Sequence, residues 1–389
     1  MSISNIKFPT LTLAIPAYNE AGNIERIIQG FLKTEYPKLI EVIVADGGST
    51  DGTQDIVNKL SLEDYRVKLL HNSLKVQSAG LNLILKECTG DIFLRADAHS
   101  DYAPDYIEQC VETLLESKAL NVGGAQRFVA KTAFQAGVVL ASKSILGSGG
   151  AKYRDSNYDG YAETVYLGCF WKEDLLKLSG YNIESTPNED YELNLRLKAY
   201  YSDNSKITNL DDRLHHKSTG LDDNETNKAI YISSKIRVWY YPRKTWKSIC
   251  IQYFKYGRGR YLTSIKHKNQ LQLRGKLPFL FISATLLLSL IDLIVPQLSL
   301  HTEALILSGL LFPFGESLRT TFKFRNNFTT ELWRGKEDEI PSCLSLCFFC
   351  GVTLLTIPIA HFSGYAYQLF RRGFLRVTGW YIKEISNES

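Results

Sequence analysis

Short apolar runs alternate with longer segments of helical periodicity over the first part of the chain. The apolar runs read as buried strands and cover residues 11–16, 39–46, 67–71, 91–95 and 120–128. Between them, residues 20–34, 50–60, 77–87 and 104–117 repeat their apolar positions at helical spacing. Strands separated by helices of about 10–15 residues predict βαβ units and a parallel sheet covered by helices.

The pattern changes in the middle of the chain. Residues 147–186 are rich in Gly, Tyr and Asp and show little periodicity, and we expect them to form the acceptor side of a cleft. Residues 188–201 predict a helix, residues 202–228 a polar loop, and residues 229–241 two short strands around Ser233 and Ser234.

A basic stretch precedes the apolar segments of the C-terminal part. Thirteen Lys and Arg, and no acidic residue, lie between Glu225 and Asp292. Aromatic residues mix with these charges over residues 245–274, which is typical of a helix lying in a membrane interface. An anionic membrane surface would attract such a stretch. The alternative is a basic helix packed against the protein.

Three apolar segments follow, and their flanks conflict. Residues 277–298 reach the roughly 20 residues that a membrane-spanning helix needs, residues 301–314 are a weaker candidate, and residues 343–370 are a strong one interrupted by Pro358. Basic residues, which favour the cytoplasm, follow both the second and the third segment. Three full crossings cannot place both flanks there, so one segment is expected to be re-entrant or interfacial.

Bulk composition narrows the function classes. The net charge of +4 is close to balanced, which argues against bulk nucleic-acid binding. No signal peptide is expected, because the first apolar run is too short. The seven cysteines form no paired framework and indicate a reducing compartment. Cys343, Cys347 and Cys350 resemble a metal spacing, but small packed side chains are the better interpretation.

Candidate chemistry gathers where predicted strands end. In parallel sheets, ligands bind at the carboxyl ends of the strands. Asp46 ends the second predicted strand, where its carboxylate could accept the N–H group of a nucleotide base, whereas Asp51 is better explained as a helix cap. Asp97 and His99 follow the fourth predicted strand.

Asp97 and His99 are a candidate metal pair. Mg²⁺ prefers oxygen ligands, whereas an imidazole suits Mn²⁺ better. The alternative is that both are polar turn residues. We expect Asp101 to cap a helix that begins at Pro104, which would leave Asp97 and His99 available for a metal.

Three acids, Glu189, Asp190 and Glu192, begin the helix predicted over residues 188–201. Acids at this position commonly complement the helix dipole. The functional interpretation is that one of them is a general base that deprotonates a sugar hydroxyl.

Taken together, these residues resemble a known family. Family 2 glycosyltransferases of the GT-A fold carry, in this order and spacing, Pro16-Ala17-Tyr18-Asn19-Glu20, the turn after Asp46, Asp97-Ala98-His99 and Asn188-Glu189-Asp190. The chain is most similar to the branch that includes the succinoglycan-biosynthesis glucosyltransferases, through residues 95–99, 123–124, 147–154, 163–165 and 252–260. His99 replaces the second Asp of the commoner D-x-D pattern, as is usual in this branch.

The resemblance implies an α/β GT-A fold, a mostly parallel sheet between helices, and an inverting transfer of one sugar from a nucleotide-sugar, with a UDP-hexose as the expected donor. It implies Asp190 as the base with Glu189 beside it, and a divalent metal, Mn²⁺ or Mg²⁺, on Asp97 and His99. The nucleotide would contact Pro16, Tyr18, Glu20, Asp46 and Asp97. Arg258 or Arg260 would touch the diphosphate or a lipid phosphate, unless they belong to a plain membrane-facing basic turn.

We therefore expect a GT-A catalytic domain over residues 1–241, a basic amphipathic interfacial segment over 242–276 and a membrane region over 277–389 with two to three hydrophobic segments. The acceptor would be a lipid-linked saccharide or polysaccharide precursor, at the inner (plasma) membrane, with the catalytic domain cytoplasmic. The Gln-x-x-Arg-Trp signature of processive synthases is absent in that form, which favours single-sugar addition. The alternatives are a sugar nucleotidyltransferase and a non-catalytic membrane scaffold with this fold.

Overall fold

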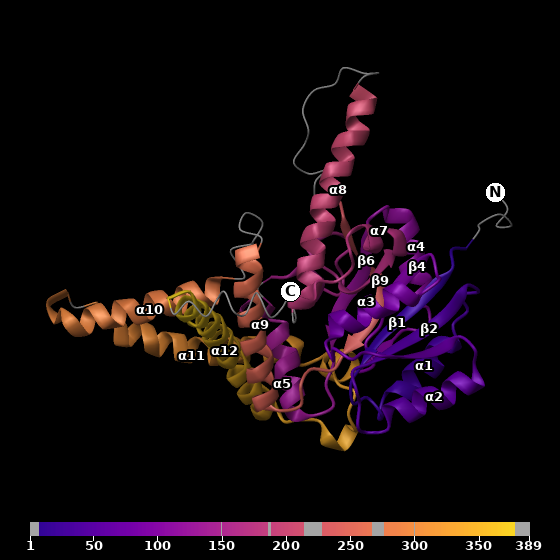
Figure 1. Ribbon diagram of the computed structural model, residues 1–389. Helices are drawn as coiled ribbons and strands as arrows, with labels where there is room; N and C mark the ends of the chain where they lie inside the picture. Colours follow the sequence, from indigo (N-terminus) through magenta and orange to yellow (C-terminus); the bar gives the residue numbers. More distant parts are fainter. Residues whose placement is uncertain are drawn as a thin grey trace. The chain divides into compact units, whose positions relative to one another are not determined.

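The computed structural model describes residues 8–148, 150–185, 188–213, 228–266, 276–298 and 300–377. They divide into two compact units (Figure 1). The first, called the catalytic unit below, comprises Met1–Arg127 and Ala151–Tyr240, and the second, the helical unit, comprises Phe128–Gly150 and Tyr241–Ser389. Residues 128–150, which the predicted division assigned to the catalytic domain, therefore belong to the helical unit.

The first part of the catalytic unit is a set of βαβ units. Its elements are β1 (Leu11–Ala17), α1 (Ile24–Leu32), β2 (Leu39–Asp46), α2 (Thr53–Glu63), β3 (Val67–His71), α3 (Gln77–Glu87) and β4 (Ile92–Arg95). The strands lie in the order β3-β2-β1-β4, and all three pairs are parallel. Each predicted strand and helix in this part is confirmed, with small differences at the ends.

The sheet continues with antiparallel strands beyond β4. The remaining elements are β5 (Ser100–Tyr102), α4 (Tyr106–Ser117), β6 (Asn121–Phe128), η2 (Lys152–Arg154), β7 (Gly160–Tyr161), β8 (Tyr166–Trp171), α7 (Lys172–Lys177), η3 (Ile183–Ser185), α8 (Glu189–Arg213) and β9 (Ile230–Tyr240). The full order in the described residues is β3-β2-β1-β4-β8-β6-β9-β5, with β7 beside β9. β8 runs antiparallel to both β4 and β6.

Two predictions for this part were wrong. The residues expected to form two strands around Ser233 form the single strand β9, in which Ser233 is buried and whose two ends pair with β7 and β5. Helix α8 extends through residues 202–213, which were expected to be loop; the rest of that stretch, 214–227, lies outside the described residues.

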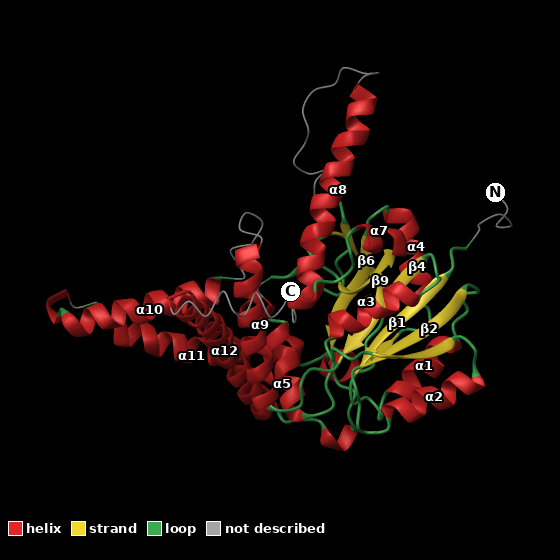
Figure 2. Cartoon of the chain, in the orientation of Figure 1, coloured by secondary structure: helices red, strands yellow, loops and turns green. Residues whose placement is uncertain are grey.

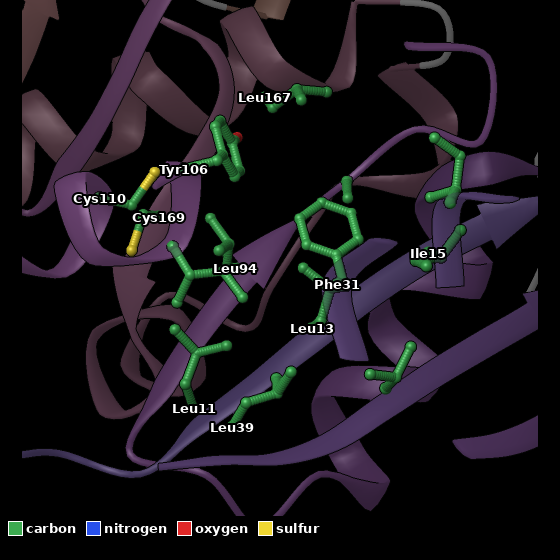
Figure 3. Close-up of a cluster of buried hydrophobic side chains, with 14 of the residues drawn as sticks. Leu11, Leu13, Ile15, Phe31, Leu39, Leu94, Tyr106, Cys110, Leu167 and Cys169 are labelled. Atoms are coloured by element: carbon green, nitrogen blue, oxygen red, sulfur yellow. The ribbon is translucent and has the colours of Figure 1, made fainter. Parts of the chain in front are cut away.

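Helices cover both faces of the sheet (Figure 2). On one face Leu11, Leu13 and Ile15 of β1 pack with Phe31 of α1 and Tyr106 of α4 (Figure 3). On the other face, Leu81 of α3 and Leu193 of α8 pack against strand residues, namely Ala14, Ile43 and Phe93. Burying a large apolar side chain contributes about 1.5–3 kcal/mol. This two-sided core fixes the strand ends that carry the polar residues.

The helical unit contains α5 (Ala133–Ser142), α6 (Ile145–Ser148), α9 (Trp246–Lys266), α10 (Leu277–Ile294), η6 (Pro296–Leu298), α11 (Thr302–Phe324), η7 (Phe328–Leu332), η8 (Glu337–Glu339) and α12 (Cys343–Val377). Among the described residues, two helical stretches, Leu277–Ile294 and Cys343–Gly373, are long and apolar enough to cross a membrane. The weak candidate at residues 301–314 does not meet that test.

Candidate active site

Polar side chains meet at one edge of the sheet because β1, β2 and β4 are parallel neighbours. Tyr18, Asn19 and Glu20 follow β1, Asp46 is the last residue of β2, and Asp97 and His99 follow β4. The predicted gathering of these residues at the carboxyl ends of the strands is therefore observed. Ligands of open α/β sheets bind at this edge.

Asp46 organises the turn that follows its own strand. Its Oδ2 accepts hydrogen bonds from the backbone N–H groups of Gly48 at 2.8 Å and Ser49 at 2.9 Å, and from Gln54 Nε2 at 2.6 Å. Its Oδ1 accepts from the Ser49 hydroxyl. Gly48 has a φ of 82°, a conformation that favours glycine. The carboxylate is only 1% exposed, so its first role is to hold this turn.

The loops after β1 and β2 are hydrogen-bonded to each other. Asn19 donates from its backbone to Ser49 Oγ at 2.8 Å and accepts from the backbone of Thr50 at 2.9 Å. Asp51 accepts from the backbone of Ala21 at 3.0 Å and of Thr53, the first residue of α2, at 3.1 Å. Asp51 thus binds the first residue of α2, as the predicted cap implies, although Gly52 occupies the N-cap position itself.

Two of the predicted nucleotide contacts differ in exposure. Tyr18, beside this pair of loops, is 60% exposed. Pro16, inside β1, is partly buried. An exposed aromatic ring at the carboxyl edge of a sheet offers a face on which a planar base can stack.

Arg95 is the centre of the site. This buried guanidinium, at the end of β4, donates from Nη1 to Asp190 Oδ1 at 2.5 Å and from Nε and Nη2 to Asp97 Oδ1 at 3.3 Å. Asp190 comes from the first turn of α8, 95 residues further along the chain. One side chain therefore joins the carboxylate proposed to face a metal to the carboxylate proposed as the base.

Gln77 extends this network to Glu189. With its amide oxygen facing Arg95, Gln77 accepts from Nη2 at 2.6 Å and donates to Glu189 Oε1 at 3.3 Å. The other carboxylate oxygen of Glu189, Oε2, is buried and has no hydrogen-bond partner among the described residues. Burial and the neighbouring charge of Asp190 raise the pKa of Glu189 to about 7. Glu189 is thus poised to carry a proton near neutrality.

Asp190 differs from Glu189 in exposure and in its partner. Its side chain is 41% exposed, whereas Glu189 is buried. Loss of hydration in the cluster raises the pKa of Asp190, and the guanidinium of Arg95 opposes that rise. Asp190 is therefore the one of the two carboxylates that is exposed enough to meet a substrate.

His99 lies beside Glu20 and Tyr240. Its Nδ1 is 3.3 Å from Glu20 Oε1, and its ring contacts the Tyr240 ring at 5.9 Å. The backbone N–H of Asp97 donates to the Tyr102 hydroxyl at 2.7 Å, and that hydroxyl donates to the Asp97 carbonyl at 2.9 Å. The short segment between β4 and β5 is held at both ends by these contacts.

The prediction that Asp101 caps a helix was wrong. Asp101 lies within β5 and forms an ion pair of 2.6 Å with Arg26 of α1. The helix begins two residues later than expected, at Tyr106, with Asp105 at the N-cap position. The local signal failed because β5 pairs with β9, which holds residues 100–102 extended.

Arg258 and Arg260 lie in α9 of the helical unit. The alternative that they belong to a basic turn was wrong, because Gly257 and Gly259 are interior residues of this helix. A Cβ atom on Gly257 would collide with the His361 carbonyl oxygen of α12, so this glycine permits close helix packing. Arg258 donates to Gln368 Oε1 at 3.2 Å. Whether either arginine contacts a phosphate stays a prediction.

Two residues of the site were not predicted from the sequence. Arg95 and Gln77 were assigned no role, although together they connect all three carboxylates. The available signal was an arginine at the end of an otherwise apolar strand, immediately before Asp97, because a buried cation requires a buried partner.

Comparisons with known proteins identify the family. A profile described as "Glycosyl transferase family 2" matches residues 12–171. The succinoglycan biosynthesis protein ExoA of Rhizobium meliloti (strain 1021) is 34% identical over 281 residues, covering 72% of this chain and 77% of the relative. The chain belongs to glycosyltransferase family 2. This membership, with the helix-covered sheet, confirms the predicted resemblance, the predicted α/β fold class and the prediction of an enzyme.

More distant proteins share parts of the chain. A dolichyl N-acetyl-alpha-D-glucosaminyl phosphate 3-beta-D-2,3-diacetamido-2,3-dideoxy-beta-D-glucuronosyltransferase of Methanococcus voltae is 25% identical over 197 residues, 48% of this chain and 61% of the relative. Among solved structures, the mannosyltransferase PcManGT of Pyrobaculum calidifontis, in complex with GDP-Man and Mn²⁺, superposes with a TM-score of 0.46 at 16% identity, covering 93% of this chain and 88% of that one.

Proposed function

We propose that this glycosyltransferase moves one sugar, with inversion, from a nucleotide-sugar donor, a UDP-hexose in the first instance, to a lipid-linked saccharide that is a polysaccharide precursor. The observation that carries the proposal is the single guanidinium of Arg95 that binds both Asp97 and Asp190. This contact brings a carboxylate after β4, the usual side for a diphosphate, next to a partly exposed carboxylate on α8. A donor and an acceptor hydroxyl need groups in this relation.

Asp190 is the proposed general base. Deprotonating a sugar hydroxyl as it attacks the anomeric carbon needs an ionised carboxylate within hydrogen-bond reach of that hydroxyl. Arg95 favours the ionised form of Asp190, while Glu189 is buried and has a pKa raised to about 7. Glu189 supports Asp190 by staying protonated, so that the two neighbouring carboxylates are not both negatively charged. Arg95 is a positioning residue, because it holds Asp190 in place.

The nucleotide is proposed to bind the linked loops after β1 and β2. Tyr18 offers an exposed ring face, and Pro16 and Glu20 flank it along the chain. The Asp46 carboxylate already accepts hydrogen bonds from Gly48, Ser49 and Gln54, so an N–H group of the base would be one further donor to it. Asp97 would meet the ribose or diphosphate end.

A divalent metal fits the chemistry of Asp97 and His99. The hydrogen bonds that Asp97's carboxylate makes in the described part of the catalytic unit all involve Oδ1, which leaves Oδ2 for a cation. The described residues hold no group of three His, Cys, Asp or Glu able to bind a metal, so diphosphate oxygens and water would complete the shell, as is usual for Mg²⁺. The imidazole favours Mn²⁺. When bound, the ion would offset leaving-group charge.

Membrane attachment is proposed from the helical unit. Its apolar helices and the acid-free basic stretch suit the cytoplasmic face of the inner membrane, where the catalytic unit would meet a lipid-linked acceptor. The relationship to a succinoglycan biosynthesis protein supports a role in polysaccharide assembly. Arg258 and Arg260 would then face phosphate at that surface.

The experiment is a panel of nucleotide-sugar donors assayed on membranes with Mn²⁺, with Mg²⁺ and with EDTA. We expect transfer from one UDP-hexose, with loss of activity in EDTA and in Asp190→Asn. The matched control is Asp101→Asn, which removes a carboxylate that pairs with Arg26 outside the cluster, and it should keep activity. Pyrophosphate release from UTP and a sugar phosphate would instead identify a nucleotidyltransferase, and full activity of Asp190→Asn would end the proposal.

A further inference from the structure

Two helices of the helical unit qualify as membrane spans by length and composition, but their surroundings differ. Leu277–Ile294 and Cys343–Gly373 both have a mean hydropathy of 2.2. None of the first stretch is buried inside the protein, whereas 39% of the second is buried. This difference bears on the conflict between the basic flanks, because it separates a helix with no buried residue, whose Phe279 still touches Phe362 and Tyr365 of α12, from a helix that is partly buried.

The start of α12 contacts the segment formed by residues 128–150. Ala130 pairs with the stretch just before α12: its N–H donates to the Leu332 carbonyl at 2.9 Å, and its carbonyl accepts from the N–H of Arg334 at 2.8 Å. Phe134 of α5 stacks edge-on against Phe349 of α12 at 5.7 Å. A side chain on Gly137 would collide with Phe349, so α5 and α12 are in close contact.

Residues 128–150 cannot cross a membrane. They leave the catalytic unit after Arg127 and rejoin it at Ala151. Their longest helix, α5, has 10 residues, a length of about 15 Å. A bilayer core is about 30 Å thick. The segment therefore stays on the side of the catalytic unit, and the start of α12, which contacts it, stays there too.

The second half of α12 lies beside α9, which follows directly after the catalytic unit. Trp246 Nε1 donates to Thr356 Oγ1 at 2.9 Å, and Arg258 Nε donates to Gln368 Oε1 at 3.2 Å. The two contacts have nearly the same spacing along both helices, so α9 and α12 run in parallel. If α12 crossed the bilayer, Lys255 and Arg258 of α9 would be drawn toward the hydrocarbon, which is costly for charged side chains.

We propose that α12 does not span the membrane, and that α10 and α11 alone enter it, as a hairpin with both ends on the side of the catalytic unit. The inference rests on the membrane attachment put forward under Proposed function. It removes the conflict between the flanks. Lys276 before α10, Arg319 and Lys323 at the end of α11 and Arg371 near the end of α12 all lie on one side, as basic flanks prefer.

The turn between α10 and α11 supports a hairpin. Asp292, the one acid in α10, accepts from the N–H of Leu300 at 2.9 Å, from Thr302 Oγ1 at 2.9 Å and from the N–H of Thr302 at 3.3 Å. It thereby caps α11, which explains an acid in an apolar segment. Large side chains on both helices stay exposed in the protein and match lipid chains, among them Phe281, Leu287, Leu293, Leu307, Leu311 and Phe312.

Cysteine labelling in sealed membrane vesicles of known orientation tests this topology. Cys343, at the start of α12, is already exposed. In a Cys343→Ser background, Leu62→Cys marks the catalytic unit, and Lys276→Cys, Lys336→Cys and Arg371→Cys mark the ends of the helices. We expect an impermeant maleimide to label these four positions, and Cys343 in the unmodified protein, from the same side.

Labelling of Cys343 and Arg371→Cys from opposite sides would overturn the proposal. The proposal would also be overturned if alkaline carbonate released the protein and every position were labelled in vesicles of either orientation, because the protein would then not be held in the membrane. Sugar transfer is measured on the same vesicles. Transfer that persists while the labelling contradicts the hairpin would refute the topology alone, whereas loss of transfer would count against the proposed function.

A matched pair of charge substitutions gives a second measurement. Leu287 of α10 and Ile359 of α12 are both exposed apolar residues well inside their helices. We expect Leu287→Arg to lower the amount of carbonate-resistant protein at least about tenfold. Ile359→Arg should leave it within about twofold, because charged side chains near a membrane surface cost little. The reverse order of the two effects would contradict a hairpin of α10 and α11.

Discussion

Two carboxylate sites lie at the same edge of the sheet and are stabilised in opposite ways. Asp46 is bound by donors within eight residues of it, in its own turn and at the start of α2. Asp97 and Asp190 share Arg95, which reaches across 95 residues of sequence to Asp190. A carboxylate whose own loop already supplies several donors has room for at most one further bond, whereas carboxylates that share one cation keep more lone pairs for a ligand. The second kind is the better place for chemistry.

The largest effect should come from Asp190→Asn, which keeps the shape of the side chain but removes the proposed base. General-base contributions are about 10²–10⁴-fold in rate. We expect kcat to fall by that range with the fold intact, measured by initial rates and by circular dichroism. A loss confined to KM would mean that Asp190 only binds the acceptor and would weaken the contrast with Asp46.

Arg95→Gln should be next, because it leaves buried carboxylates without their cation. Removing one partner of a buried ion pair costs about 3–5 kcal/mol. Arg95 also lowers the pKa of Asp190, so its loss should raise that pKa and move the acid limb of the pH–kcat/KM profile to higher pH.

Arg95→Lys is the matched control for that experiment, since it keeps the charge but not the forked geometry. It should keep the acid limb closer to that of the unmodified enzyme than Arg95→Gln does, while still lowering activity. An unchanged limb in both variants would show that Arg95 has a purely structural role.

Glu189→Gln should change how stability depends on pH. The folded-state pKa of Glu189 is raised to about 7 from an unfolded value of about 4.5, so the folded state binds the proton more tightly. Its contribution is complete below pH 4.5 and is lost as the pH rises toward 7. The variant should lose this decline, which is on the order of 3 kcal/mol, in urea unfolding at several pH values. A parallel decline in both proteins would refute the raised pKa.

Asp46→Asn should have the smallest effect of the four. It weakens hydrogen bonds to a charged acceptor into bonds to a neutral one, which costs about 1 kcal/mol. Because the turn lies at the proposed base pocket, we expect KM for the donor to rise while kcat stays near its normal value. A loss of kcat comparable to that of Asp190→Asn would erase the distinction between the two sites.

The extent of prediction from sequence follows the same division. Strands β1 to β4 and helices α1 to α4 were predicted because their periodicity is local, and the Asp46 turn was found because its glycines are adjacent in sequence. Arg95 and Gln77 escaped because their partners on α8 are brought near only by the completed sheet. Asp101 was misassigned for the same reason, since pairing of β5 with β9 outweighed a local helix-start signal.

The same limit applies to the C-terminal part. Hydropathy alone ranks α10 and α12 as equals, and only the packing of α12 against α5 and α9 separates them. The basic flanks show that three full crossings are inconsistent, but they do not show which segment stays outside the membrane. That depends on contacts of α12 with α5, which lies far earlier in the chain.

The placement of residues 128–150 in the helical unit has a consequence for biosynthesis. As the ribosome delivers the chain, the apolar helix α5 emerges long before α11 and α12, the helices that later cover it. Contacts so distant in sequence form late, and an uncovered apolar helix invites aggregation in the meantime. A chain truncated after Tyr240 to obtain the catalytic unit alone would make that exposure permanent, so a soluble version should have residues 128–150 replaced by a short polar linker.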